Sequence, residues 1–530
     1  MRSSAQKILR SAALVMALTL LSKTSGLFLD VIVAAKFGTS PETDAFLVAA
    51  TIASLLFVWL NNPIRVVFVP LFTQDLTTQG ERTAWDNASI LINTSVLLFV
   101  IIAAAGWLLS PYLVALIAPG FAPETSALAA DLTRLMMLTL VFVGLAKLLS
   151  GVLHSYQRFG WPGMVSTVEN VVNILCIVIL APFLGIYVLA VSAVLGAFVQ
   201  ALIQAPILWK FRSYYKPQID LKSPTLRRMA RVSLPLFIGA SGTRLGKITD
   251  RIFASLLQAG SLSALAYGYR ITYAGFELFV DSLTTVLFPF FSKKAALENY
   301  EDFAKKLSKC LRMLFWIVFP LSIGLILLNE PLVRLVYQRG AFNEESAKLT
   351  GQAVVFYAIG LWAYSLCNVL TFAFYSLHKT KTPVVIGLVR LAIKILLSSI
   401  LVKTMTHAGL ALSESISFIV KAVLLFAFLP AELKQHAEYR KILTSFGMTA
   451  VTTAAMGAII YLMLPTLHQA FAAGTSLIAS SMSLGTAVTF GIASYLIVSL
   501  LIHSAELRSF YGLLRNGFSR VAPTASNRQR

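Results

Sequence analysis

Long apolar runs recur along the whole 530-residue chain. A helix needs roughly 20 apolar residues to cross a bilayer, and runs of this length are repeated here without the alternation of a β-barrel strand. The pattern predicts an all-α polytopic membrane protein with about 14 spans. We place them at 8–35, 44–72, 86–110, 128–155, 162–183, 187–209, 232–257, 263–291, 310–329, 349–377, 383–402, 408–430, 442–464 and 482–503.

Composition supports the same class. The chain is 57% hydrophobic and 13% charged, with a mean hydropathy of +0.77, which is more apolar surface than one soluble core can bury. The first apolar run follows Arg2, Lys7 and Arg10 and continues past Lys23 to Ala35 without a convincing cleavage site. We therefore expect an uncleaved first span and not a signal peptide.

The net charge of +21 is distributed by loop. Lys and Arg are concentrated in 210–231, 293–312 and the tail from Arg508, whereas 111–127, 258–263 and 465–482 carry almost none. This asymmetry predicts that both termini are cytoplasmic. It also explains the basic charge through topology and anionic lipids, without a nucleic-acid partner.

An internal repeat organises the chain at an offset of about 220 residues. LVALIAPGFAPET (113–125) resembles LVRLVYQRGAFNEES (332–346), and HSYQRFGWP (154–162) resembles YSLHKTKTP (375–383). Two six-helix units of the same orientation are predicted, as in alternating-access transporters with a cavity between the halves. The predicted parts are a first half (1–212), a basic linker (213–231), a second half (232–433), two extra helices (434–511) and a basic tail (512–530).

The sequence lacks recognisable catalytic and metal-binding motifs. Cys176, Cys310 and Cys367 are scattered singly, and there is no HExxH pair, Walker loop or nucleophile elbow. We expect no metal, no cofactor and no enzymatic activity.

Charged residues inside the predicted spans are the strongest functional signal, because each costs on the order of 2.5–3.5 kcal/mol at a helix centre. Basic residues outnumber acids, and a basic cavity in low dielectric attracts anions. We predict a phosphate or pyrophosphate site formed by Lys23, Arg65, Arg244, Lys247 and Arg270. Acidic cavity residues that carry a coupling ion are predicted to be Asp30, Asp250, Glu277 and Asp281. Alternatively, Lys23–Asp30 and Lys247–Asp250 are structural pairs, while Arg65 and Arg251 extend to the interface.

Other polar positions have weaker patterns. Asp44 begins a span, which suits a helix cap or dipole partner, and the same position suits a gate. Arg390 and Lys394 are candidates for lining a cavity of the second half. Asn170 and its neighbours Glu169 and Asn173 are expected to form interhelical hydrogen bonds.

The motif set resembles the MurJ (MviN) family of the multidrug/oligosaccharidyl-lipid/polysaccharide exporter superfamily. The resemblance rests on SKTSGLFLDVIVAAKFGTSPETDAFLVA (22–49), followed by FVPLF, APGF, YGYR, LFPFFSK and YQRGAF. It implies a 14-helix flippase of the bacterial cytoplasmic membrane that moves lipid II, an undecaprenyl-pyrophosphate-linked peptidoglycan precursor, to the outer leaflet. It also implies that the last two spans form a groove for the lipid tail.

The chain looks like a divergent member of that family. Lys23 stands where the family usually has Arg, Leu29 where it has Arg before the Asp, and Lys247 in a span that is usually uncharged. Lipid II is the expected substrate, and another lipid-linked oligosaccharide of exopolysaccharide or O-antigen type is the alternative. The resemblance leaves the driving force open between membrane potential and a coupling proton, sodium or chloride ion. A monomer among membrane lipids is expected, with cell-wall synthesis proteins as partners.

Three rival functions remain open. A cation-coupled multidrug exporter would need an acidic or aromatic cavity, whereas the predicted cavity is basic. A membrane glycosyltransferase would need acids on a large outer loop, whereas the predicted outer loops are short. A scaffold without transport would leave the buried charges as an unexplained cost.

Overall fold

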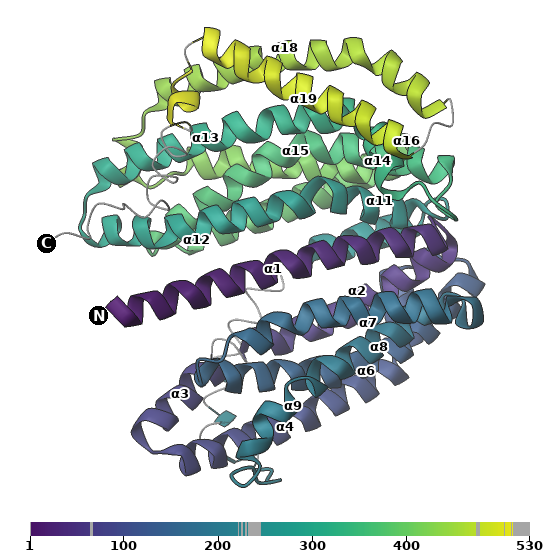
Figure 1. Ribbon diagram of the computed structural model, residues 1–530, viewed down its shortest axis with the longest axis vertical. Helices are drawn as coiled ribbons and strands as arrows, with labels where there is room; N and C mark the ends of the chain where they lie inside the picture. Colours follow the sequence, from purple (N-terminus) through teal and green to yellow (C-terminus); the bar gives the residue numbers. More distant parts are fainter. Residues whose placement is uncertain are drawn as a thin grey trace, which may run out of the picture. The chain divides into compact units, whose positions relative to one another are not determined.

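The computed structural model describes residues 2–63, 67–220, 222–223, 226–227, 231, 245–472, 477–502, 504–509 and 511. The elements in these ranges are helices, and no strand occurs among them (Figure 1). Within the described ranges, nine helices are long and apolar enough to cross a membrane. The predicted all-α polytopic fold is confirmed.

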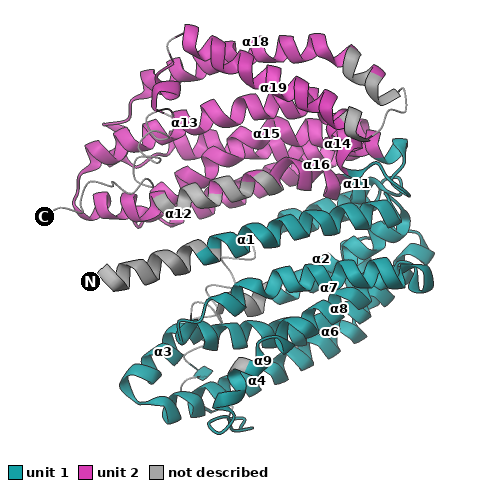
Figure 2. Cartoon of the chain, viewed as in Figure 1, with its two compact units in different colours: residues 1–264, 337–346 teal, residues 265–336, 347–530 magenta. Residues whose placement is uncertain are grey.

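The chain divides into two compact units (Figure 2). Unit 1 contains residues 1–264 and 337–346. In it, α1 packs on α7, α8 packs on both α6 and α7, and α6 also contacts α2 and α4. Its helices are α1 (Arg2–Phe37), α2 (Pro41–Pro63), α3 (Val69–Thr78), α4 (Glu81–Leu108), α5 (Ser110–Ile117), α6 (Pro123–Ser155), α7 (Gly160–Leu184), α8 (Tyr187–Leu202), α9 (Ala205–Leu208) and the helical residues 245–255.

Unit 2 contains residues 265–336 and 347–530. The helix α18 packs on α13 and α19, and the Tyr495 hydroxyl donates to the carbonyl of Trp316 at 2.7 Å. Its helices are α11 (Ser261–Tyr269, which begins in unit 1), the π-helical η3 (Arg270–Ala274), α12 (Gly275–Ala296), α13 (Tyr300–Leu327), α14 (Asn329–Tyr337), α15 (Glu344–Ser376), α16 (Lys381–Ala427), α17 (Ala431–Lys434), α18 (Tyr439–Ala472) and α19 (Leu477–Leu501).

The unit boundary differs from the repeat boundary. The helical residues 245–255 follow the predicted start of the second half at 232, yet they belong to unit 1. The repeat describes which segments are alike, whereas the units describe which segments pack together. The predicted division at 212 and 232 therefore stays a prediction about the repeat.

Backbone geometry repeats at the predicted offset. Gln157 and His378 each have a φ of 57°, and Gly185 and Thr406 have φ values of 54° and 52°. Both pairs are 221 residues apart, and such left-handed conformations are uncommon for residues other than glycine. The short helices α5 and α14 also occupy matching places, after α4 and α13. These shared irregularities confirm the internal repeat, although the apolar pattern did not predict the short helices.

Thr406 divides α16 into two arms. Its φ of 52° and ψ of −131° lie outside the helical region, so the 47-residue helix consists of residues 381–405 and 407–427. The arms match the predicted spans 383–402 and 408–430. Within the predicted span 44–72, α2 is described to Pro63 and α3 begins at Val69, and residues 64–66 lie outside the described residues.

Polar side chains connect α7 to its neighbours in unit 1. The Asn170 amide donates to the Ser22 carbonyl at 3.0 Å and to the Ser25 hydroxyl at 2.9 Å, both on α1. The Gln200 amide of α8 donates to the Glu169 carboxylate. The predicted interhelical hydrogen bonding of this segment is confirmed for Glu169 and Asn170.

The segment 337–346, which includes the loop between α14 and α15, packs against the end of α1. Its Ala341 N–H donates to the Ala35 carbonyl at 2.8 Å, and the hydroxyls of Ser346 and Thr39 lie 2.6 Å apart. A Cβ on Gly340 would lie 2.3 Å from the Ala35 oxygen. The glycine therefore permits both the left-handed turn, with a φ of 57°, and the close backbone approach.

A glycine also joins α15 to the second arm of α16 in unit 2. The Ser415 hydroxyl accepts from the Gly360 N–H at 3.1 Å and donates to the Phe356 carbonyl at 2.5 Å. A Cβ on Gly360 would lie 2.5 Å from the Cα of Ser415. This contact requires a glycine, because the obstacle is backbone.

Alanine substitution at two helical glycines should distinguish the effect of close packing on stability from the effect of helix propensity. Gly360→Ala forces α15 away from Ser415, so we expect a thermal unfolding midpoint in detergent several degrees lower, equivalent to about 1–3 kcal/mol of overpacking. Gly387→Ala is the matched control, because a Cβ added there would have no atom within 4 Å. Its midpoint should be unchanged or slightly higher, and equal losses in both variants would contradict the packing role of Gly360.

Candidate functional site

The predicted cations of unit 1 lie on α1 and on the helical residues 245–255. Lys23 and Lys247 are both exposed, and Asp30 is half-buried. The alternative, a structural pair between Lys23 and Asp30, stays a prediction. Arg65 and Arg244 were predicted as phosphate ligands and lie outside the described residues.

Thr51 of α2 contacts Arg251, one of the helical residues 245–255, inside unit 1. The Arg251 Nε donates to the Thr51 hydroxyl at 3.1 Å, and Thr51 is buried. Arg251 also interacts electrostatically with Asp44. The sequence suggests Arg251 either as a cavity cation or as a side chain reaching the membrane interface. It does not reveal the contact with Thr51, because a hydroxyl partner on another span has no fixed spacing.

Asp44 caps a helix other than its own. One carboxylate oxygen accepts from the Gly260 N–H and the other from the Ser263 N–H, each at 2.7 Å. Gly260 immediately precedes α11 and Ser263 lies in its first turn, where backbone N–H groups lack helical partners and attract negative charge. Asp44 is 3% exposed, so the carboxylate serves the N-terminus of α11, while Ser40 accepts from the Thr43 N–H at the start of α2.

Arg270 lies at the start of the π-helical turn η3 in unit 2 and is exposed. Single π-helical turns are often found at functional sites. Tyr273 in the same turn is fully buried, and its ring stacks on Tyr269 with centroids 4.5 Å apart. The aromatic contacts fix the backbone that presents Arg270. The side chains of Glu277 and Asp281, predicted as coupling acids, lie outside the described part of α12.

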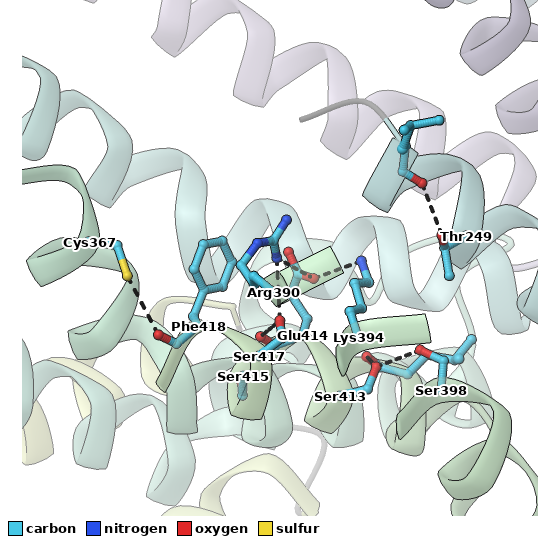
Figure 3. Close-up of polar contacts among 12 residues, drawn as sticks. Thr249, Cys367, Arg390, Lys394, Ser398, Ser413, Glu414, Ser415, Ser417 and Phe418 are labelled. Atoms are coloured by element: carbon cyan, nitrogen blue, oxygen red, sulfur yellow. Dashed lines mark hydrogen bonds and ion pairs between the residues drawn. The ribbon is translucent and has the colours of Figure 1, made fainter. Parts of the chain in front are cut away.

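Arg390 and Lys394 converge on one carboxylate between the arms of α16 (Figure 3). The Lys394 ammonium lies 2.7 Å and the Arg390 guanidinium 3.3 Å from the same oxygen of Glu414. The exposed fractions of the three residues are 8% for Arg390, 1% for Lys394 and 9% for Glu414. These two cations were predicted to line a cavity, and the structure places them in a buried ion cluster.

Neighbouring groups complete this cluster. Arg390 lies 4.4 Å from the centroid of the Phe418 ring and 3.3 Å from the Ser417 hydroxyl. The Ser398 and Ser413 hydroxyls pair across the arms at 2.8 Å. A spacing of four residues puts Arg390, Lys394 and Ser398 on one face. Sequence reasoning found the cations but not the role of Glu414, because the kink at Thr406 brings it opposite them.

The architecture and its charges define a class of protein. Two similar helical repeats, each with membrane-length helices, carry exposed cations on otherwise apolar segments. These features are typical of secondary transporters built from internal repeats.

The family follows from comparison with known proteins. The model of the family "Lipid II flippase MurJ" matches residues 33–482, and the chain belongs to this family. A probable lipid II flippase MurJ from Vibrio cholerae serotype O1 is 28% identical over 94% of this chain and 96% of its own length. The lipid II flippase MurJ of Burkholderia cenocepacia is 29% identical over 79% of this chain and 83% of its own. The resemblance noted from the motifs is confirmed.

Solved structures have the same fold. A lipid II flippase MurJ in an inward closed conformation matches with a TM-score of 0.76 and 22% identity, over 93% of this chain and 99% of that one. An inward-facing multidrug resistance transporter of the MATE family matches with a TM-score of 0.67 and 14% identity, over 80% of this chain and 98% of that one. Fold alone therefore does not separate a lipid substrate from a drug substrate.

Removal of the Glu414 charge should unfold the α16 hairpin more readily. Glu414→Gln leaves two buried cations without this counterion, so we expect a loss on the order of 3 kcal/mol, seen as a lower unfolding midpoint in detergent. The control is Glu432→Gln. The exposed Lys379 ammonium lies 2.7 Å from both Glu432 oxygens and holds the pKa of that carboxyl below its usual range. This surface variant should melt like the wild type, and so would Glu414→Gln if the cluster were unimportant.

The capping role of Asp44 can be tested at the amides that it serves. Asp44→Ala leaves two buried N–H donors without this acceptor, with an expected loss of about 1–3 kcal/mol. Hydrogen–deuterium exchange should accelerate at Gly260 and Ser263, and less so in Asp44→Asn, which keeps one acceptor oxygen. Glu42→Ala, at an exposed position in the first turn of α2, is the control. Unchanged protection in Asp44→Ala would contradict the cap.

Proposed function

We propose that this protein is a flippase that moves lipid II across the cytoplasmic membrane by alternating access. The observation that carries the proposal is the family match over residues 33–482, supported by a relative aligned over 96% of its own length. The protein acts as a transporter and not as an enzyme. The membrane is the bacterial cytoplasmic membrane, with both termini in the cytoplasm, as the loop charges favour.

The pyrophosphate of the substrate would bind the exposed cations. Lys23, Lys247 and Arg270 are exposed in segments that are otherwise apolar or small, and Arg65 and Arg244 complete the proposed set. A cation in an apolar segment carries a desolvation cost that an anionic ligand offsets. Arg270 offers a two-pronged donor for phosphate oxygens, whereas each lysine acts as a point charge.

Arg390 and Lys394 are assigned a different role. Their contacts with Glu414 occupy both cations in a buried cluster, which supports a structural function in unit 2. We infer that they hold the two arms of α16 together while the rest of the protein changes conformation. The phosphate site is thus made from the exposed cations and not from every cation in a span.

The return step requires a driving force. Asp30, Asp250, Glu277 and Asp281 are the proposed carriers of a coupling proton or ion, and membrane potential acting on the cations is the other candidate. Asp44 is the proposed gate element, because its carboxylate joins α2 to the start of α11. Opening on that side would have to break both hydrogen bonds.

A second substrate class has specific support. Lys23 and Leu29 stand where the resemblance to the family implies arginine, which favours a different arrangement of the cationic groups. A different lipid-linked oligosaccharide would share the pyrophosphate and differ in the sugar. Its flipping would use the same cations.

Replacement of the host flippase tests the substrate. Expression in a bacterium depleted of its own lipid II flippase should restore growth and lower the lipid II content of the cytoplasmic leaflet. Lys23→Gln, Lys247→Gln and Arg270→Gln should each slow lipid II flipping in proteoliposomes about tenfold, the effect of losing one charge-assisted phosphate contact. Lys23→Arg should retain activity.

The control is Lys306→Gln, an exposed lysine near the start of α13. It should flip at the wild-type rate. If the protein restores growth but none of the three substitutions slows flipping, the proposed phosphate site is wrong, although lipid II is still the substrate. Failure to support growth despite normal membrane expression would favour the other lipid-linked oligosaccharide.

A further inference from the structure

Unit 2 contains an apolar pocket of about 290 Å³ between α13, α15, the second arm of α16 and α18. Phe315, Trp362 and Leu366 form part of its wall, and Ile442 lines it from α18. The ring of Phe315 packs on Trp362 at 5.2 Å between centroids and on Phe446 at 4.0 Å. These aromatic contacts make one wall of the pocket firm.

The pocket faces hydrocarbon. Val423 lines it and is 59% exposed, and Leu443, next to the lining residue Ile442, is 74% exposed. Large exposed apolar side chains on a membrane-length helix are in contact with lipid tails and not with water. An occupant of this pocket therefore enters from the bilayer.

One cation lines the pocket. Arg312 extends from α13, and its Nη1 lies 3.3 Å from a Glu506 oxygen. Its Nε is buried and has no hydrogen-bond partner among the described residues. A buried donor without an acceptor carries a desolvation cost that a ligand oxygen would remove. Guanidinium groups favour phosphate oxygens.

The rim has a positive charge. Arg440 and Lys441 are exposed in the first turn of α18, immediately before Ile442. Lys441 pairs with Glu438 at 2.5 Å. Together with Arg312, these side chains favour a negatively charged headgroup beside an apolar slot.

We propose that a glycerophospholipid with an anionic headgroup occupies this pocket, with one acyl chain against Phe315 and Trp362 and its phosphate at Arg312. A phosphodiester carries one negative charge, and the cations Arg312, Arg440 and Lys441 exceed the two carboxylates that they contact, Glu506 and Glu438, by one charge. A polyprenyl pyrophosphate carries more charge and would be repelled by the Glu506 carboxylate. The bound lipid would fill the space between α13, α16 and α18. This inference does not depend on the identity of the transported substrate.

Native mass spectrometry of the purified full chain, titrated with phosphatidylglycerol, tests the proposal. Arg312→Gln removes the phosphate donor, and Ala422→Leu fills the pocket while leaving Arg312 and Glu506 intact. Each should weaken phosphatidylglycerol binding at least about fivefold, the loss expected for one hydrogen bond to a charged group or for a blocked site. Two variants are used because Arg312→Gln also disturbs the pair with Glu506.

Matched controls are Lys306→Gln for charge and Val451→Leu, at an exposed position of α18 outside the pocket, for volume. Both should bind phosphatidylglycerol like the wild type. Wild-type binding by Ala422→Leu would overturn the proposal. So would displacement of phosphatidylglycerol by an equimolar polyprenyl pyrophosphate, because the pocket would then hold the substrate tail.

Discussion

Charge burial is the constraint on which unit 2 depends. Placing an ion in an apolar helix bundle costs several kcal/mol unless a partner and additional hydrogen bonds accompany it. Glu414 meets this requirement for Arg390 and Lys394 at once, because both cations contact the same carboxylate oxygen. The kink at Thr406 makes the arrangement possible, since it folds the second arm of α16 back toward the first. The kink therefore brings the three charges together, and their ion pairs in turn hold the two arms together.

The same constraint acts differently in unit 1. Asp44 is buried without an ion pair in direct contact among the described residues, and its charge is stabilised by two backbone amides at the N-terminal end of α11. Such amides are free only in the first turn of a helix. The carboxylate therefore fixes where α11 begins relative to α2, a restraint that apolar packing alone would not give.

The fold was predictable to the extent that it follows from hydropathy and repetition. Continuous apolar runs located the spans, and the similarity of 113–125 to 332–346 located the repeat. The short helices α5 and α14 in these segments were not predicted. Site partners were less predictable. Arg390 and Lys394 stood out as charges, but the role of Glu414 depends on the direction of the α16 hairpin. Arg251 and Thr51 are 200 residues apart, and a neutral hydroxyl gives no signal in a hydrophobic sequence.

Cations in this protein can be sorted by whether the fold already encloses them. Arg390 and Lys394 are surrounded by a carboxylate, a ring and hydroxyls, so a ligand would have to displace contacts that are already made. Lys23 is exposed, and Arg312 retains a buried donor without an acceptor among the described residues. Cations of this second kind can meet an anion without giving up a buried ion cluster. Whether a cation binds an anionic ligand therefore depends less on its position within a span than on whether other side chains of the folded protein already surround it. The lipid pyrophosphate site and the membrane phosphate site proposed above are accordingly built on cations that the fold leaves exposed or with an unused donor.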